Sequence, residues 1–339
     1  MESDNVTLGQ RKTKLTNNRS STNNHMDKNI AVNKLELISG FTDSKKASHR
    51  FIRRNLAPYW FLLPAFILYV AFFIYPLIYS FYLSFHKWNL ISPIIKFVGF
   101  SNYTYLFHAE IFRKSLVNTL LYVLYTVPAS MIIGLILALL IEKLKRGKQF
   151  YRSLFFLPVI CTTAIISIVW ELMYNPNIGT INKLLGMIGI HGGNWLNDPK
   201  LALAALAVIG IWKQFGYNMV LFISGMKAIN QEMYEAISID GAGRLKQTWH
   251  ITIPLLSPTT FFVLIMSVIS SFQVFTTIQV ITQGGPNNAT NVVVYEIYLE
   301  AFKYFDIGTA TASSLLFLII VSTFTILQLK LGQKHVYYQ

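Results

Sequence analysis

The sequence predicts an all-α polytopic membrane protein with six transmembrane helices. Hydrophobic residues make up 53% of the 339 residues and charged residues only 13%, against roughly 25% charged in a soluble domain. Six apolar stretches are long enough to cross a hydrocarbon core about 30 Å thick, because a helix rises about 1.5 Å per residue. The expected spans are 59–85, 116–141, 150–173, 201–225, 254–282 and 308–331.

These stretches are too long for barrel strands and lack their alternation of apolar and polar residues. Several prolines lie within or at the ends of the spans. Neighbouring helices can satisfy the backbone groups that a proline frees, so kinks are expected at these positions. The prolines are Pro64, Pro76, Pro128, Pro158 and Pro258.

The distribution of Lys and Arg predicts the orientation. Of the 29 Lys and Arg residues, 21 fall before the first span, in the loops after spans 2 and 4, or after the last span, and seven fall on the other side. Cytoplasmic loops carry the excess of positive charge. Both termini are therefore expected in the cytoplasm, and the loop between spans 4 and 5 with them.

Residues 1–50 differ from the rest of the chain. They are rich in Asn, Ser, Thr and Lys and poor in apolar residues, so the sequence predicts a disordered, basic cytoplasmic tail. Binding of RNA is the alternative use of such a basic segment. No apolar stretch with a small-residue cleavage site opens the chain, so no signal peptide is expected. The six-span transmembrane domain is expected over 51–339, with a core module over about 112–332.

The most informative run, 235–254, lies in the loop between spans 4 and 5. Residues 231–239 read as a helix, Gly241 and Gly243 supply a turn, and residues 245–251 read as a second helix that ends before Pro254. The residues alone leave two readings open. The pair is either an ordinary amphipathic connector or a docking element for another protein.

The spacing of this run resembles the EAA loop of ABC importer permeases. That loop has Glu-Ala-Ala, three residues, Gly, nine residues and Ile-x-Leu-Pro. Here Glu235, Ala236, Gly241, Ile251 and Pro254 stand at the matching positions, while Ile237 and Ile253 depart mildly. Further segments, among them 61–64, 97–103, 155–158, 211–213 and 282–286, resemble the carbohydrate (maltose-type) permeases, and the resemblance covers nearly all of 56–333.

The resemblance implies the partners. These would be a second homologous permease in a heterodimer, two ABC ATPase subunits, an extracytoplasmic solute-binding protein, the sugar and membrane lipid, with no nucleic acid. No GxxxxGK[ST] phosphate loop occurs in the sequence, so ATP would be used by the partner and no cofactor is expected. The residues expected to couple to the ATPase are Glu235, Ala236, Asp240, Gly241, Ala242, Gly243 and Pro254.

Polar side chains within spans 4 and 5 are the candidate substrate contacts, because polar groups in a membrane are costly and tend to be functional. Hydroxyls and amides beside aromatic rings suit a sugar. Contacts between helices are the alternative use of such residues. The resemblance to maltose-type permeases places Ser267, Ser271, Thr276 and Tyr217 on contact positions. The full candidate set is Lys213, Gln214, Tyr217, Asn218, Ser267, Ser270, Ser271 and Thr276.

Lys213 lies near the middle of span 4, where an unpaired charge is unfavourable. It could hold an acidic sugar, or it could pair with Glu171 or with a backbone carbonyl. The single cysteine, Cys161, excludes an intrachain disulfide, and the histidines show no metal-binding spacing. The sequence shows no nucleophile, base or metal-binding group in an arrangement that would indicate an enzyme.

The sequence therefore predicts a permease subunit of an ATP-dependent importer in a prokaryotic plasma (inner) membrane, carrying a sugar or oligosaccharide. Import of glycerol phosphate or another polar solute by the same architecture is the alternative. An ion-coupled secondary carrier is a further alternative, although such carriers normally show inverted repeats with intramembrane acids.

Overall fold

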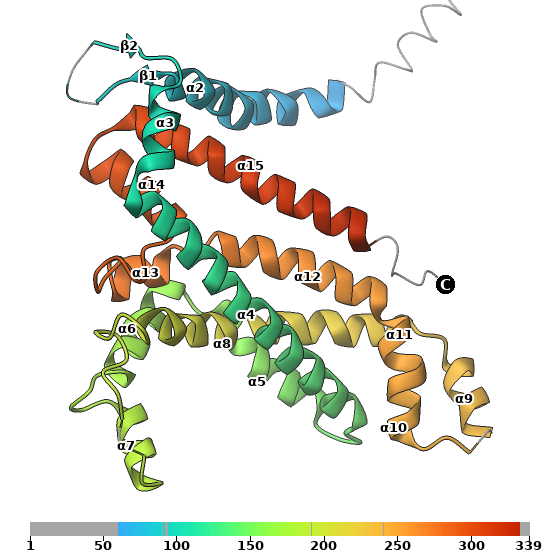
Figure 1. The fold of residues 1–339 in the computed structure, drawn as a ribbon. Coiled ribbons are helices and arrows are strands. Elements are labelled where there is room, and N and C mark those ends of the chain that lie inside the picture. The colour runs from blue at the N-terminus through green and yellow to red at the C-terminus, as the bar shows by residue number, and fades with distance from the viewer. Residues whose placement is uncertain (1–59, 90, 92–93, 191, 240, 333–339) are drawn as a thin grey trace, which may run out of the picture. The chain divides into compact units, whose positions relative to one another are not determined.

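The computed structural model describes residues 60–89, 91, 94–190, 192–239 and 241–332 (Figure 1). The tail expected over 1–50 lies outside these ranges. The chain divides into two compact units, Met1–Leu77 and Ile78–Gln339. The all-α prediction is confirmed, since the described elements are helical apart from one two-stranded ribbon.

The described part of the first unit belongs to one apolar helix, Trp60–Ser84. Most of its apolar side chains are exposed; Phe61, for example, is 88% exposed, whereas Leu83 near the end of the helix is buried. Such a surface is expected of a helix that faces lipid. A π-helical turn, η1 (Val70–Ile74), precedes Pro76.

The second unit contains the remaining elements, beginning within α2 (Tyr75–Ser84). The strands β1 and β2 pair antiparallel, with His86 opposite Phe97. In chain order the elements are β1 (His86–Lys87), β2 (Lys96–Phe97), α3 (Ser101–His108), α4 (Glu110–Lys143), α5 (Lys148–Ile160), α6 (Thr163–Met173), α7 (Thr180–Met187), α8 (Ala202–Ala228), α9 (Gln231–Ile239), α10 (Arg244–Gln247), η2 (Thr248–Thr252), α11 (Ile253–Leu255), α12 (Ser257–Phe272), α13 (Thr276–Ile281), α14 (Val293–Tyr298), η3 (Leu299–Lys303) and α15 (Ile307–Gly332).

Five described segments are long and apolar enough to cross a membrane, and a sixth would be the pair α5 and α6. The third expected span, 150–173, is not one straight helix. It bends by 95° between Ile160 and Thr163. Pro158 lies inside α5 and Cys161 has an extended backbone, so the break follows the proline by three residues.

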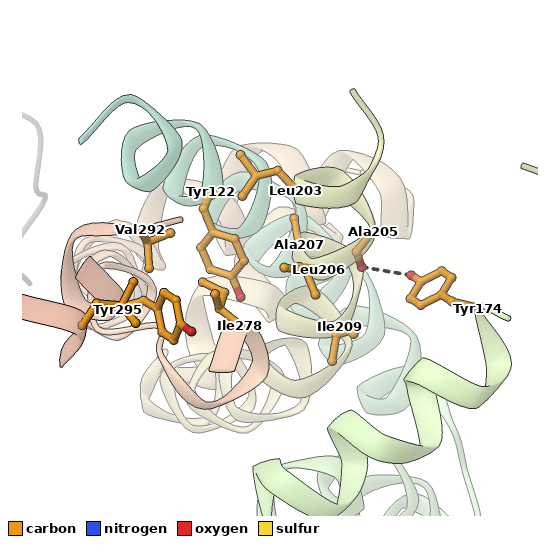
Figure 2. Packing of buried hydrophobic residues seen from close by; sticks show 11 residues of the cluster. Tyr122, Tyr174, Leu203, Ala205, Leu206, Ala207, Ile209, Ile278, Val292 and Tyr295 are labelled. Atoms are coloured by element: carbon orange, nitrogen blue, oxygen red, sulfur yellow. Dashed lines mark hydrogen bonds between the residues drawn. The ribbon is translucent and has the colours of Figure 1, made fainter. Parts of the chain in front are cut away.

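The centre of the second unit is formed by α4, α8 and α12, which pack against one another (Figure 1). The backbones of α4 and α8 approach closely at Gly134, where a Cβ would lie 2.9 Å from the Cβ of Asn218. Small residues permit such close packing between membrane helices. Figure 2 shows the largest buried cluster, in which Tyr122 of α4 packs beside Leu206 of α8 and Ile278 of α13.

The fifth expected span, 254–282, is also interrupted. The helix α12 ends at Phe272, and α13 begins at Thr276. The polar side chains expected within one continuous fifth span are therefore divided between two helices and the residues between them. Of the prolines expected to kink helices, Pro128 lies within α4, a single helix, and Pro258 lies in the first turn of α12.

Candidate functional site

A polar cavity of about 200 Å³ lies among α4, α6, α8, α12 and α13. Hydroxyl and amide side chains make up much of its wall. Its lining residues are Tyr122, Thr126, Thr163, Ile209, Gly210, Lys213, Gln214, Ser270, Ser271, Gln273, Val274, Phe275, Thr276 and Thr277.

Two interrupted helices meet at this cavity. Thr163 begins α6 directly after the break from α5, and residues 273–275 form the break between α12 and α13. The two C-terminal halves, α6 and α13, also contact each other. Irregular backbone at membrane depth is tolerated where protein buries it or where it lines a cavity, and transporters place substrate sites at such breaks.

Lys213 connects α8 to the break between α5 and α6. Its Nζ atom donates to the carbonyl oxygen of Cys161 at 2.7 Å and to that of Pro158 at 3.3 Å. Of the two partners expected for this lysine, the backbone carbonyl is therefore the one observed, and Glu171 lines a different pocket. No carboxylate is among the residues that line the cavity around Lys213.

The structure separates the predicted substrate residues into two groups. Five line the cavity: Lys213, Gln214, Ser270, Ser271 and Thr276. The other three lie elsewhere: Tyr217 is half-buried outside the lining, and Asn218 and Ser267 are both fully buried.

Asn218 and Ser267 join three helices. The Nδ2 atom of Asn218 donates to the hydroxyl of Ser130 on α4 at 3.2 Å. The hydroxyl of Ser267 on α12 donates to the Oδ1 atom of Asn218 at 3.2 Å. These contacts match the alternative use of polar residues, which is hydrogen bonding between membrane helices.

The cavity also contains residues that were not among the predicted contacts. Tyr122 and Thr126 come from α4, and Thr163 comes from α6. The hydroxyl of Thr126 donates to that of Ser271 at 3.0 Å, so α4 and α12 share this wall. These residues could have been suspected from the sequence only because they carry hydroxyl groups within the expected spans 116–141 and 150–173. Hydroxyl groups in membrane helices more often bond one helix to another, so this signal is weak.

The second candidate site is a pair of helical arms, called here the α9–η2 pair. Its first arm is α9, and its second arm is α10 continued by η2. The inner face of α9 carries Tyr234 and Ile237, which pack on the cluster around Leu256. The hydroxyls of Tyr234 and Thr252 lie 3.1 Å apart and connect the two arms. Glu235 and Ala236 are exposed on the opposite face. The predicted helix 231–239 is confirmed.

Gly241 makes the turn between the arms. Its φ angle is +73°, in the left-handed region that glycine adopts without strain. Its N–H donates to the carbonyl of Ser238, and the next N–H, of Ala242, donates to that of Ile237. This is the Schellman pattern that ends helices. Gly243, expected to share the turn, has an ordinary φ of −64°, and Asp240 lies outside the described residues.

The second arm does not end before Pro254, contrary to the prediction. It runs from α10 through the π-helical turn η2 into α11, which contains Pro254. In η2 the N–H of Ile253 donates to the carbonyl of Thr248, five residues earlier. This wider turn directly before the proline is the same arrangement as η1 before Pro76, and it lets the helix continue despite the missing proline N–H.

Three large apolar side chains of the pair are strongly exposed. Ile239 is 87% exposed, Leu245 71% and Trp249 63%. The expected coupling set, which centred on Glu235 and the glycines, did not include these side chains. Contiguous exposed apolar patches mark contacts with other molecules, so these three side chains are added to the candidate residues of this pair.

An apolar helical bundle that encloses a polar cavity between two broken spans has the form of a membrane transport permease. The family described as "Binding-protein-dependent transport system inner membrane component" matches residues 98–334. The chain belongs to this family.

Curated relatives and solved structures agree with this assignment. A probable ABC transporter permease protein, YurN of Bacillus subtilis, is 33% identical over 282 residues, covering 82% of this chain and 96% of the relative. The sn-glycerol-3-phosphate permease UgpA of Agrobacterium fabrum is 34% identical over 285 residues, covering 84% and 97%.

Two crystal structures of a bacterial ABC transporter for alginate share the fold. One, described as involved in import of that acidic polysaccharide, has a TM-score of 0.74 at 22% identity and covers 84% of this chain and 98% of its own. The other, in complex with an alginate pentasaccharide-bound periplasmic protein, has a TM-score of 0.71 at 22% identity and covers 82% and 94%. These two structures show the shared fold, while the family match and the two relatives identify the chain as an inner-membrane permease subunit of the ABC importer type.

Proposed function

We propose that this subunit translocates a sugar or oligosaccharide delivered by an extracytoplasmic solute-binding protein. The cavity between the two broken helices is the observation that carries this proposal. Gln214, Ser270 and Thr276 offer hydrogen-bonding groups there, and Phe275 offers an aromatic surface. Hydroxyls of a sugar need such partners, while its CH faces pack on aromatic rings. Alternating access would open this cavity to each side of the membrane in turn.

The energy would come from partner ATPases. In this proposal the α9–η2 pair docks on an ATPase subunit, with Ile239, Leu245 and Trp249 as its apolar contact and Glu235 facing a basic group. Two ATPases and a second homologous permease complete the transporter. The pair and both termini lie in the cytoplasm, as the distribution of Lys and Arg indicates. The subunit uses no cofactor of its own.

An acidic solute is the second candidate. Lys213 brings a positive charge to a cavity whose lining contains no carboxylate. Its ammonium group has three protons, and two are directed to backbone carbonyls, so one donor is left for a solute. Glycerol phosphate and acidic sugars have the matching charge, and UgpA and the alginate transporter are named for solutes of this kind.

Reconstitution distinguishes these candidates. The permease with its partner subunits and binding protein is placed in proteoliposomes, and ATP-dependent uptake of labelled neutral oligosaccharides, uronate oligosaccharides and glycerol phosphate is measured. We expect uptake of one sugar class that requires both ATP and the binding protein. Uptake that follows an ion gradient without ATP would instead establish a secondary carrier.

A further inference from the structure

A second cavity, of about 410 Å³, lies where the ends of α4 and α8 meet the α9–η2 pair. It is larger than the polar cavity between the broken helices and shares no residue with it. Four cationic side chains line it: Lys143 at the end of α4, Lys145 just beyond, Lys227 at the end of α8 and Arg244 at the start of α10. The volume lies within the range of small-ligand pockets, roughly 300–1,000 Å³.

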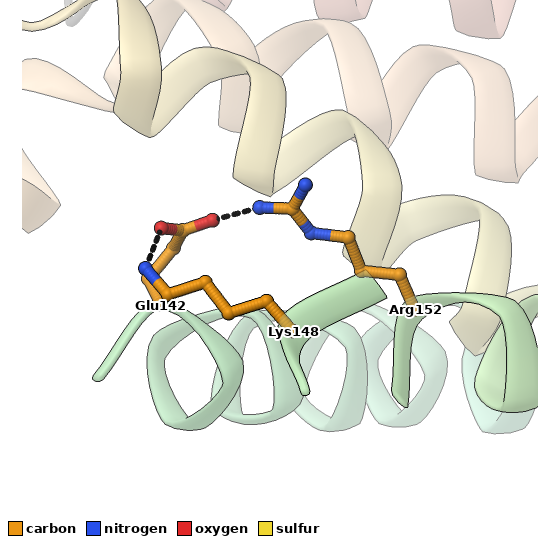
Figure 3. A network of polar contacts seen from close by, with 3 residues as sticks. All are labelled: Glu142, Lys148 and Arg152. Carbon is orange, nitrogen blue, oxygen red and sulfur yellow. Dashed lines mark hydrogen bonds and ion pairs between the residues drawn. The ribbon is translucent and has the colours of Figure 1, made fainter. Parts of the chain in front are cut away.

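The only carboxylate in the lining is already neutralised. Glu142 accepts hydrogen bonds from Lys148, at 2.9 Å, and from Arg152 (Figure 3). These two ion pairs join the end of α4 to the start of α5. These are the only two ion pairs within the described ranges. The four cations around the cavity therefore have no counter-charge in the described part of the chain.

Unpaired cations gathered around one cavity favour an anion, since each repels the others and attracts the same ligand. Uncharged polar side chains stand beside them, namely Tyr234, Gln247, Thr248 and Thr252. Apolar residues, Leu139 of α4 and Met226 of α8, complete the wall. The ligand therefore has an anionic part and an apolar part.

The position of the cavity identifies the ligand further. The candidate spans Glu110–Lys143 and Ala202–Ala228 both end at this cavity, and lipid headgroups surround the ends of membrane-spanning helices. Basic pockets between helices at the ends of their spans bind anionic lipid headgroups. An acidic loop of a protein would use the cations but would have no use for apolar wall residues inside the bundle.

We propose that this cavity binds the phosphate-bearing headgroup of an anionic phospholipid. The lipid would join α4 and α8 to Arg244 of the helix pair and so hold the pair in place beneath the spans. This proposal goes beyond transport of the solute and would stand whichever solute is carried.

Lipid retention by the intact complex tests it. The purified transporter, with all its subunits, is titrated with phosphatidylglycerol or phosphatidylcholine, and bound lipid is counted by native mass spectrometry. The cavity variant is Lys143→Gln/Lys227→Gln/Arg244→Gln. The matched control removes the same charges from exposed positions outside the cavity, as Arg146→Gln/Lys246→Gln/Lys330→Gln. Inorganic phosphate is tested as the soluble alternative.

We expect the wild type and the control to prefer phosphatidylglycerol, and the cavity variant to bind it about tenfold more weakly or worse. Equal binding by cavity variant and wild type would overturn the proposal. So would a cavity variant that keeps the lipid but loses the ATPase, because the cations would then serve a protein partner. Binding of inorganic phosphate without retained lipid would also overturn it.

Discussion

The ammonium nitrogen of Lys213 lies 2.7 Å from the carbonyl oxygen of Cys161, at the break between α5 and α6. A break in a membrane helix leaves carbonyls without their usual N–H partners, and each unsatisfied group is costly in an apolar surrounding. A lysine 52 residues further along the chain supplies the donor. The break and the lysine therefore form one structural unit at the wall of the polar cavity.

Replacing Lys213 by Met should destabilise the protein and abolish uptake. Hydrogen bonds from a charged donor contribute about 1.5–3 kcal/mol, and two carbonyls would lose their partner. Thermal unfolding of the purified complex measures the loss. Lys213→Arg should retain part of the stability, and Lys183→Met, at an exposed position, should change nothing. A Lys213→Met protein with wild-type stability but altered solute preference would show that the lysine serves the solute alone.

Reversing the charge at Glu235 should uncouple transport without harming assembly. The side chain is exposed, so Glu235→Lys leaves the bundle unchanged but would repel a basic group on the ATPase. We expect weaker ATPase retention in pull-downs and loss of ATP-driven uptake. Glu232→Lys, also exposed on α9, is the matched control. Normal retention and uptake in the Glu235 variant would exclude the docking role.

Replacing Gly241 by Val should have the same consequence through the backbone. Its φ of +73° costs a branched residue roughly 1–3 kcal/mol, while an added Cβ would meet no neighbouring atom. The defect should therefore come from the turn and not from a clash. Gly243→Ala, at an ordinary φ, should retain ATPase binding. Equal ATPase binding by both variants and wild type would show that the turn is not needed for docking.

Replacing each of two serines on α12 by Ala should give two different defects, one in solute affinity and one in stability. Ser270 lines the cavity, so Ser270→Ala should weaken solute affinity several-fold, by about 0.5–1.5 kcal/mol, with unchanged thermal stability. Ser267 donates to the buried Asn218, so Ser267→Ala should lower thermal stability, because it leaves a buried acceptor with one partner fewer. Solute titrations and melting curves of both variants measure this. A Ser270→Ala protein with normal affinity would remove this residue from the solute site.

Stability should fall as the pH rises from about 4.5 to 7, because of Glu300. Burial, with the neighbouring carboxylates of Glu296 and Asp306, raises the pKa of Glu300 to about 7 from its ordinary 4.5, although a hydrogen bond from Ser313 opposes the shift. The folded protein therefore holds a proton that the unfolded chain releases over this range. The loss is on the order of 2–3 kcal/mol.

Melting curves between pH 5 and 8 test this dependence. Glu300→Gln keeps an acceptor for Ser313 but cannot ionise, so its stability should vary less with pH than that of the wild type. Glu110→Gln, which removes an exposed carboxylate, should keep the wild-type slope. Identical slopes for wild type and Glu300→Gln would show that Glu300 ionises freely in the folded protein.

The apolar spans and the helix pair were predictable because their signals are local. The length of an apolar run decides whether it can span a bilayer, so the expected spans agree with the observed helices to within a few residues at most ends. The turn at Gly241 was predictable because a left-handed residue after an amphipathic helix is encoded by the glycine itself. Ile251 and Pro254 have the spacing of the EAA loop, but the prediction that the second helix ends before Pro254 was wrong.

The cavity depended on tertiary contacts that the sequence does not display. Nothing in the sequence near Phe272 indicates that α12 ends there. Pro158 predicted a kink in the third span, but nothing in the sequence indicated that the bend would reach 95°. Asn218 and Ser270 looked equivalent as polar residues in apolar runs, yet one is fully buried between helices and the other lines the cavity.

The physical reason is that a polar group in a membrane must find a partner, and the partner can come from anywhere in the chain. The length of an apolar segment determines whether it enters the membrane. Only the packed bundle decides which carbonyls Lys213 satisfies, which hydroxyls Asn218 joins, and which polar groups are left to face the cavity.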